Sequence, residues 1–576
     1  MKEINGELWR RFLNIAKPFW FSEEKKSARG LLFVLLALML AVNGLNVAIN
    51  YVGGDFMTAL SDKNAPKFFH LLFMYAGVFI IGTPIVVYYS WVQQKLGINW
   101  RKWMTSSLLE RYFQKRAYYQ INSNSAIDNP DERISQDVHS FTTAALSFAL
   151  VILSSVITLI SFTAILWSIS KLLVGILIVY SIAGTLATVY LGKNLIGLNF
   201  NQLRKEANFR YGLIHVRNNV ESIAFYGGEE REKAQTRGKF AQLFANFNLL
   251  IGAERNLNFL TTGYNYLVVI IPSIVIAPLY FSGKVHFGVI SQADMAFAQV
   301  LGALSVVVTS FQDLTAFIAQ TNRLATFSEA LETPTAHQSD GNRIEFQPSE
   351  SVEMRDLCVQ TPDYKTTLLQ KLSTEIKPGE SILVMGPSGS GKSSFLRAIA
   401  GLWDSGSGSI KHPDLQDMLF LPQRPYMMLG TLRSQLLYPR TESNVTDCEL
   451  AEILNRVNLS DLAQRVGGLD VEIDWANYLS VGEQQRLAFA RIFLAKPKFA
   501  ILDEATSALD VQNESRLYAE LKKLGTAYIS VGHRASLAPF HNQVLDLDGS
   551  GGWSIRPATQ VVAANPAAAH LGAQVN

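Results

Sequence analysis

A glycine-rich segment in the C-terminal half of the sequence has the residue types and spacing that bind nucleotide phosphates. Its residues are Gly386, Pro387, Ser388, Gly389, Ser390, Gly391, Lys392, Ser393 and Ser394. The segment follows directly on an apolar stretch, residues 381–385, as the strand–loop–helix arrangement of a phosphate loop requires. Glycines let backbone N–H groups approach phosphate oxygens, Lys392 supplies charge to the β- and γ-phosphates, and Ser393 offers a hydroxyl to Mg²⁺. We therefore expect ATP and Mg²⁺ as ligands.

A second apolar stretch, residues 499–502, ends in the acids Asp503 and Glu504. Asp503 is expected to hold the Mg²⁺ shell, and Glu504 to act as the general base that polarises the attacking water. His533 follows a further apolar stretch, residues 528–531, and is expected to contact the γ-phosphate. The alternative, two solvated acids and a structural histidine, is disfavoured by the phosphate loop in the same region.

Composition indicates that these groups belong to one part of a divided chain. The sequence has 576 residues, of which 48% are hydrophobic and 17% are charged. These values are typical of a membrane part joined to a soluble part. The net charge of +3 gives no reason to expect nucleic acid as a partner. The two cysteines, Cys358 and Cys448, form neither a disulfide framework nor a zinc cluster and are expected to be reduced thiols.

Six apolar stretches are long enough to cross a bilayer as helices. They cover residues 31–51, 68–92, 144–167, 172–192, 260–279 and 295–311. Lys and Arg gather before the first stretch, between the second and third, and between the fourth and fifth, whereas the opposite connections are short. The positive-inside rule then places both termini in the cytosol. The two long internal connections are expected to be helical extensions.

Two further patterns lie near the N-terminus. An amphipathic stretch with basic neighbours is expected to form a helix in the membrane interface; its apolar residues are Trp9, Phe12, Leu13, Ala16, Phe19 and Trp20. Asn43, Asn46 and Asn50 share one face of the first span. They predict either a polar stripe lining a substrate cavity or hydrogen bonds between helices.

The segment Leu479-Ser-Val-Gly-Glu-Gln-Gln-Arg486 resembles the signature motif of ATP-binding cassette proteins. The resemblance extends over the domain and implies that Gln423 is the Q-loop residue at the metal, residues 507–510 the D-loop, and His533 the switch histidine. It also implies that Ser480, Gly482 and Glu483 of one subunit meet the γ-phosphate held by another. Val481 and Glu483 depart from the common signature, which puts the rate of hydrolysis in question. Tyr364 is the candidate adenine-stacking aromatic.

Two segments of the membrane half are Asn129-Pro-Asp-Glu-Arg-Ile134 and Glu221-Ser-Ile-Ala-Phe-Tyr-Gly227. Both resemble motifs of the peroxisomal fatty-acyl-CoA transporter family, subfamily D, and its bacterial relatives. The resemblance implies an exporter-type fold in which these segments couple the membrane part to the ATPase. The expected coupling residues are Asn129, Asp131, Glu132, Arg133, Glu221, Tyr226 and Gly227.

The expected fold is a polytopic α-helical membrane domain with six exporter-type spans, followed by an α/β P-loop ATP-binding cassette domain. Residues 1–330 are assigned to the membrane domain, 331–350 to a linker, 351–557 to the ATPase domain and 558–576 to a disordered tail. The expected function is ATP-driven transport by a homodimer, or by a heterodimer with a sister chain, in a bacterial inner membrane with the ATPase in the cytosol. Acyl compounds are the first candidate substrates; hydrophilic solutes such as peptides or cobalamin are the alternative. An ATP-gated channel or regulator, and a soluble mechanical ATPase, are the alternatives from other classes.

Overall fold

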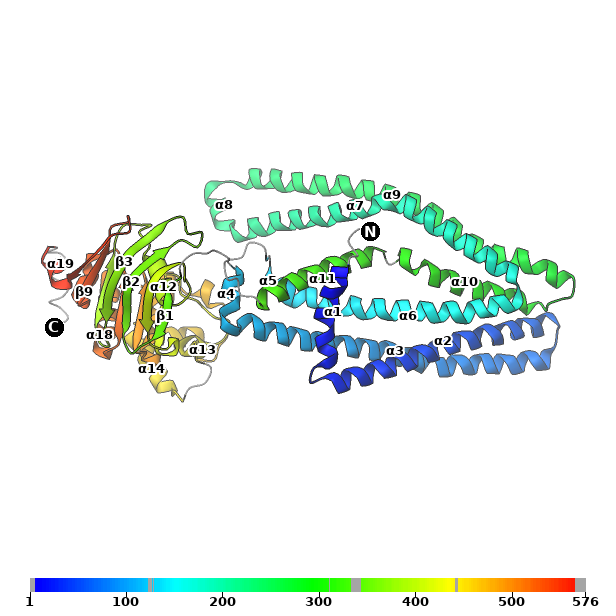
Figure 1. Ribbon diagram of the computed structural model, residues 1–576, viewed down its shortest axis with the longest axis horizontal. Coiled ribbons are helices and arrows are strands. Elements are labelled where there is room, and N and C mark those ends of the chain that lie inside the picture. The colour runs from blue at the N-terminus through cyan, green and yellow to red at the C-terminus, as the bar shows by residue number, and fades with distance from the viewer. Residues whose placement is uncertain are drawn as a thin grey trace. The chain divides into compact units, whose positions relative to one another are not determined.

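The computed structural model describes residues 6–122, 127, 129–309, 311–332, 343–440 and 444–564. The chain forms two compact units, Met1–His337 and Gln338–Asn576 (Figure 1). Each unit has hydrophobic cores of its own.

The first unit is helical. Its helices are α1 (Gly6–Phe21), α2 (Lys25–Ser61), α3 (Ala65–Phe113), η1 (Gln114–Arg116), α4 (Ala117–Asn122), α5 (Pro130–Glu132), the π-helical turn η2 (Arg133–Asp137), α6 (Val138–Ile169), α7 (Lys171–Asn218), α8 (Val220–Tyr226), α9 (Glu229–Phe281), α10 (Gly288–Thr309) and α11 (Phe311–Glu332). Six helical segments are long and apolar enough to cross a membrane, which confirms the six predicted spans. The sixth begins at Gly288, earlier than predicted, because its first turns hold polar residues that weaken the hydropathy signal.

The long helices pair as antiparallel neighbours, α2 with α3 and α7 with α9, and the short α8 joins α7 to α9 at the tip of their hairpin (Figure 1). Helix α7 has 48 residues and α9 has 53. At 1.5 Å per residue each runs for about 70–80 Å, more than twice the thickness of a bilayer core. The predicted helical extensions are therefore present.

Helix α1 carries the amphipathic stretch. Phe19 is fully buried and stacks on Trp100 of α3, with ring centroids 5.6 Å apart. Trp9, Leu13 and Phe21 stay exposed. The helix thus packs on the bundle with one face and leaves apolar side chains outside. Its position in the membrane interface stays a prediction.

The second unit is built on two sheets. The smaller has the strand order β1 (Glu345–Pro348), β5 (Gly406–His412), β2 (Val352–Gln360), β3 (Thr367–Ile376). The larger has the order β10 (Trp553–Pro557), β9 (Gln543–Leu547), β4 (Ser381–Met385), β8 (Ala527–Val531), β7 (Phe499–Asp503), β6 (Met418–Leu421). Strands β9, β4, β8, β7 and β6 are parallel. The carboxyl ends of β4, β7 and β8 therefore meet at one edge, where ligands bind in open α/β sheets.

The helices of this unit lie between and beside the strands (Figure 1). They are α12 (Lys392–Ile399), η3 (Leu415–Asp417), α13 (Leu432–Leu437), α14 (Asp447–Arg456), α15 (Leu462–Val466), α16 (Trp475–Tyr478), α17 (Val481–Ala495), α18 (Val511–Leu524), η4 (Ala535–Phe540) and α19 (Ala558–Ala564). The predicted α/β class of this domain is confirmed.

Two boundaries differ from the prediction. Strand β1 lies inside the expected linker and pairs with β5, so the ATPase fold begins before residue 350. Residues 558–564, expected to be disordered, form α19, where Ala558 is buried and Val561 and Val562 pack on the core. The uncharged composition that suggested disorder belongs here to a helix that packs on the core. Residues 333–342 and 565–576 lie outside the described part of the chain.

Candidate functional site

The phosphate loop connects β4 to α12 and is built around glycines that no other residue could replace without strain. Gly386 has φ +144°, and a Cβ added there would lie 2.5 Å from the carbonyl oxygen of Leu547. Gly391 has φ +90° and is the N-cap residue of α12. The loop thus exposes backbone N–H groups at a helix N-terminus, the geometry that binds anions.

Lys392 begins α12 and folds back over the loop. Its Nζ donates to the carbonyl oxygens of Gly386 at 3.0 Å and Pro387 at 2.8 Å. Burial lowers the pKa of Lys392, while the nearby charges of Glu504 and Asp503 act in the opposite direction. The ammonium group is thus held at the loop by neutral acceptors, which leaves its charge for phosphate oxygens.

The two predicted acids lie at the end of β7, beside the loop. Ser393 Oγ donates to Asp503 Oδ1 at 3.2 Å, so the two expected metal ligands are in contact. Burial raises the pKa of Asp503, the Ser393 hydrogen bond lowers it, and the charge of Glu504 raises it. The balance is a pKa above the ordinary value for aspartate. A cation at this position would reverse that balance.

Glu504 lies between the other two predicted groups. Gln423 Nε2 donates to its Oε2 at 2.8 Å, and His533 Nε2 lies 3.1 Å from its Oε1. Glu504 itself has φ +48°, a conformation that is unfavourable for a residue with a side chain. Residues far apart in sequence therefore converge on one carboxylate, as a general base with orienting partners requires.

The residues at this edge fit Mg²⁺. Within the described ranges no cluster of three His, Cys, Asp or Glu side chains forms a metal cage. Mg²⁺ bound with a nucleotide does not need one, since it takes one or two carboxylates together with phosphate oxygens and water. Ser393 and Asp503 offer such ligands, and Ser390 Oγ is buried in the loop without a hydrogen-bond partner among the described residues. Gln423 could join them from its place beside Glu504.

The signature segment begins α17 through a capping box. Ser480 Oγ accepts from the Glu483 N–H at 3.3 Å, and the Glu483 carboxylate accepts from the Ser480 N–H at 2.9 Å. The second carboxylate oxygen of Glu483 pairs with Arg465 at 2.6 Å. Burial raises the pKa of Glu483, but the Arg465 and Ser480 hydrogen bonds outweigh it and leave the pKa below its usual value. The unusual Glu483 is therefore held firmly, and its contacts belong to the cap.

Gly482 and Val481 complete the first turn of α17. A Cβ added at Gly482 would lie 3.2 Å from the carbonyl oxygen of Ala508, so this glycine allows the D-loop to pass close to the helix. Val481 is exposed, so its side chain does not crowd a neighbouring segment of the same chain. Substitution of the first signature glycine by valine is therefore tolerated within a single chain.

Sequence reasoning missed Gln485, which joins three of the motifs. This buried side chain donates to Ser507 Oγ at 3.2 Å and to the carbonyl oxygen of Gln423 at 3.4 Å, and it accepts from the Ala508 N–H at 3.0 Å. Its position in the signature run was visible in the sequence, but its partners were not. Gln485 links the signature helix, the Q-loop and the D-loop.

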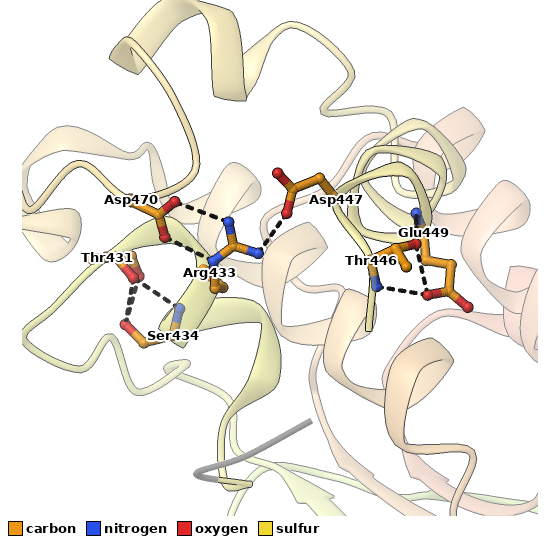
Figure 2. Close-up of polar contacts among 7 residues, drawn as sticks. All are labelled: Thr431, Arg433, Ser434, Thr446, Asp447, Glu449 and Asp470. Atoms are coloured by element: carbon orange, nitrogen blue, oxygen red, sulfur yellow. Dashed lines mark hydrogen bonds and ion pairs between the residues drawn. The ribbon is translucent and has the colours of Figure 1, made fainter. Parts of the chain in front are cut away.

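A second set of polar contacts positions the helices beside α17 (Figure 2). Arg433 pairs with Asp470 through two nitrogens, at 2.7 and 2.9 Å, and with Asp447 at 2.7 Å. Thr446 and Glu449 form a capping box at the start of α14. Arg433 therefore connects α13 to α14 and to the loop at Asp470.

Tyr364 lies in the connection between β2 and β3. Its backbone N–H donates to the Thr361 carbonyl oxygen at 2.8 Å. Leu368, at the start of β3, packs on the phosphate loop, since a Cβ at Gly391 would lie 3.1 Å from its Cβ. The connection that carries Tyr364 thus runs towards the phosphate loop. Stacking on adenine stays a prediction.

The first group of expected coupling residues is bound within the membrane unit. Arg133 is only 3% exposed, and its Nη1 donates to the Arg323 carbonyl oxygen at 2.6 Å and to Thr326 Oγ1 at 3.0 Å. Arg323 pairs with Glu132 at 3.3 Å and with Asp137 at 2.8 Å. Asn129 Nδ2 donates to Glu132 at 3.3 Å, and Asp131 is exposed. The segment is therefore bound to α11, the last helix before the ATPase domain in the sequence.

The second group lies at the tip of the α7–α9 hairpin, on α8. Glu221 is exposed, Tyr226 is 89% exposed, and Gly227 ends the helix with φ +59°. Val220 and Phe225 are also exposed. The tip therefore exposes aliphatic and aromatic side chains together with Glu221, and its role in coupling stays a prediction.

Two of the three asparagines of α2 bond neighbouring helices. Asn43 Oδ1 accepts from Thr158 Oγ1 of α6 at 2.9 Å, and Asn50 Nδ2 donates to the Gln292 carbonyl oxygen of α10 at 2.9 Å. Asn46 is partly buried in a groove between α2 and α3. These contacts favour the helix–helix alternative for Asn43 and Asn50 and leave Asn46 as the accessible member.

Known proteins share both halves of this arrangement. Residues 16–281 match the family described as ABC transporter transmembrane region 2, and residues 369–507 match the family described as ABC transporter. ABC transporter D family member 2, chloroplastic, from Arabidopsis thaliana is 43% identical over 94% of this chain and 86% of its own length. The human lysosomal cobalamin transporter ABCD4 is 32% identical over 96% of both chains.

An uncharacterised ABC transporter ATP-binding protein from Synechocystis sp. is 51% identical over 92% of this chain and 81% of its own length. A solved bacterial Atm1-family ABC exporter with ATP bound has a TM-score of 0.73 at 18% identity, covering 95% of this chain and 98% of its own, which confirms the exporter-type fold. Six membrane spans, one ATPase domain and these relatives lead to one conclusion: the chain is a multi-pass membrane ATPase coupled to transport, an ABC half-transporter of the D family.

Proposed function

We propose that two copies of this chain form a transporter in which ATP closes the two ATPase domains and drives alternating access. The observation that carries the proposal is the convergence of Gln423 and His533 on Glu504 beside the phosphate loop. Glu504 takes the proton of the attacking water, Gln423 and His533 orient it, and Lys392 holds the phosphates. Ser393, Asp503 and Gln423 would hold Mg²⁺, which would neutralise charge on the phosphates.

The second copy completes each ATP site. Ser480 and Gly482 lie at the N-terminus of α17, an arrangement that suits the γ-phosphate held by the partner. A single chain contributes one phosphate loop and one signature segment, so head-to-tail pairing uses both. The complete catalytic set in this chain favours a homodimer over a pairing with a sister chain.

Closure reaches the membrane part by two routes. One route begins at the exposed tip around Tyr226 and Gly227, and the other runs through the contact of Arg133 with α11. The differential affinity of ATP for the closed state supplies the free energy for the switch.

Acyl compounds, including fatty acids and acyl-CoA-like molecules, are the first candidate substrates, on the D-family membership. Hydrophilic solutes such as peptides or cobalamin are the second, favoured by the relative named as a cobalamin transporter. The basic internal connections favour an ATPase domain in the cytosol, and the bacterial relative favours a bacterial inner membrane. ATP-dependent accumulation against a gradient would exclude a channel or regulator.

The test is ATP hydrolysis and flux by the protein reconstituted in lipid, with fatty acids, acyl-CoAs, peptides and cobalamin as the ligand panel. Glu504→Gln is the blank. Saturable stimulation and uptake of acyl compounds support the first substrate class, and those of polar ligands the second. Hydrolysis no higher than the blank with every ligand, in a preparation that binds ATP, contradicts the proposed function.

A further inference from the structure

One acid lies within the membrane-spanning part of α10 and has no role in the mechanism above. Asp294 is the single charged residue of α10, and α9 carries no charged residue from Asn256 to Phe281. Asp294 lies six positions after Gly288, the first residue of α10, or about 9 Å along the helix axis. Gly288 packs on Gly54 of α2, near the outer end of that helix. Asp294 thus lies well inside a hydrocarbon core of about 30 Å.

The carboxylate has little protein to bind. Ser273 Oγ on α9 lies 3.4 Å from Asp294 Oδ1 and 3.5 Å from Oδ2, both long contacts, and the same hydroxyl also reaches the Val269 carbonyl oxygen at 3.3 Å. No Lys, Arg or His of the described residues forms an ion pair with Asp294. An ionised carboxylate has about four lone-pair sites, so one shared hydroxyl leaves most of them open.

The packing of α10 shows which way the uncovered side of the Asp294 carboxylate faces. Ala293, Ala296, Phe297 and Val300 of α10 are buried in the bundle core, whereas Asp294 is only partly buried. A charged group in a span is costly, by about 2.5–3.5 kcal/mol on insertion scales, and such residues face the protein interior or a water-filled cavity. In a half-transporter, the second copy encloses the other side of the transport pathway, which the uncovered side of Asp294 would then face.

We infer that Asp294, oriented by Ser273, lines the transport pathway and binds a cationic or N–H-bearing group of the transported molecule. A carboxylate attracts an ammonium group and repels a free carboxylate at the same position. The inference rests on the proposed transport function and names a feature of its substrate. It favours the second substrate class over free fatty acids, and it is compatible with an acyl compound that carries an amine or amide.

The experiment measures equilibrium binding to the purified full-length protein in detergent, before any turnover. The probes are amphiphiles with one alkyl chain and a primary ammonium, a neutral amide or a carboxylate head group. The wild type is expected to bind the ammonium probe most tightly, Asp294→Asn to weaken that binding about tenfold, and Asp294→Glu to restore most of it. Asp55→Asn, a neutralised and exposed acid near the outer end of α2, is the matched control and should bind as the wild type does.

Equal binding of the ammonium probe by the wild type and Asp294→Asn would overturn the inference, as would a wild type that prefers the carboxylate probe. Because Asp294→Glu keeps the charge, its recovery separates a lost ligand contact from misfolding. Flux assays then separate the two proposals. Asp294-dependent binding without ATP-dependent transport would leave the site standing and contradict the transport function.

Discussion

Arg133 and Arg323 link the same two segments of the membrane unit, one through a backbone carbonyl and the other through ion pairs. The Arg133 guanidinium donates to the Arg323 backbone carbonyl at 2.6 Å, while the Arg323 guanidinium pairs with Glu132 and Asp137 on either side of Arg133. The contact joins a π-helical turn to α11, and π-helical turns are frequent at functional sites. The pair therefore fixes how the first coupling segment lies on the helix that leads to the ATPase domain.

Replacing Arg323 with alanine is expected to uncouple transport from hydrolysis. The change leaves the buried Asp137 without its ion pair, a loss of about 1–3 kcal/mol within the membrane unit. It weakens the contact with α11, which then depends on the Arg133 bonds to the backbone carbonyl of position 323 and to Thr326. Ligand-dependent flux per ATP should fall at least about tenfold while unstimulated hydrolysis stays within about twofold. Arg210→Ala, an exposed arginine on α7, is the control. A variant that keeps the wild-type ratio of flux to hydrolysis would show that the pair does not transmit closure.

Replacing Glu504 with glutamine is expected to remove hydrolysis and spare ATP binding. Glutamine keeps the size of the side chain and a hydrogen-bond acceptor but cannot take a proton. The turnover number should fall by about 10²–10⁴-fold, as is usual when a general base is lost. Binding of a fluorescent ATP analogue and steady-state phosphate release measure the two quantities. Glu452→Gln, on the surface of α14, is the control; ordinary turnover by Glu504→Gln would refute the assignment.

The cap at the start of α17 is expected to depend on pH. Because the folded protein lowers the pKa of Glu483, the charged carboxylate stabilises the fold above the ordinary pKa of glutamate, about 4.3, and this contribution is lost as the pH falls through the lower folded value. At pH 7 Glu483→Gln, which keeps a capping acceptor but loses the Arg465 pair, should therefore unfold at a lower temperature than the wild type.

That difference in melting temperature should shrink as the pH is lowered from about 5 to below 4. Thermal unfolding of the full-length protein in detergent, followed at stepped pH, measures it. Glu449→Gln, at the matching position of the α14 capping box but with no arginine partner among the described residues, is a useful comparison. A difference that does not change with pH would mean that the Glu483 charge contributes nothing to the cap.

Asn43 and Thr158 are expected to be coupled in stability. Their side chains share one hydrogen bond between α2 and α6, at 2.9 Å. Double-mutant cycles of such bonds in membrane helices average about 0.6 kcal/mol and reach about 1.7 kcal/mol. Unfolding of Asn43→Ala, Thr158→Ala and the double variant should give a coupling energy in that range, with ligand affinity unchanged. Zero coupling together with weaker ligand binding would instead favour the substrate-cavity alternative.

The sequence by itself determined the parts of the molecule that rest on local patterns. The phosphate loop, the acids at the end of β7 and the apolar spans are each contiguous, so residue type and spacing carry them. The sequence predicted a role for each of Gln423, Glu504 and His533. It did not predict that Gln423 and His533 converge on Glu504, since the three residues lie on separate segments. The tail at 558–564 was misjudged because its uncharged composition describes a disordered segment and a packed helix equally well.

Only the tertiary structure decided what lies beside what. Arg323 carries no motif, and its importance comes from Glu132 and Asp137, which are distant in sequence. Asn43, Asn46 and Asn50 look equivalent along the helix, yet neighbouring helices use two of them and leave the third in a groove. Asp294 directly precedes the sixth predicted span; only the structure places it inside the spanning helix α10 and shows its sparse set of partners on α9. The physical reason is common to all three: helical periodicity fixes which residues share a face, whereas packing of distant helices fixes what that face meets.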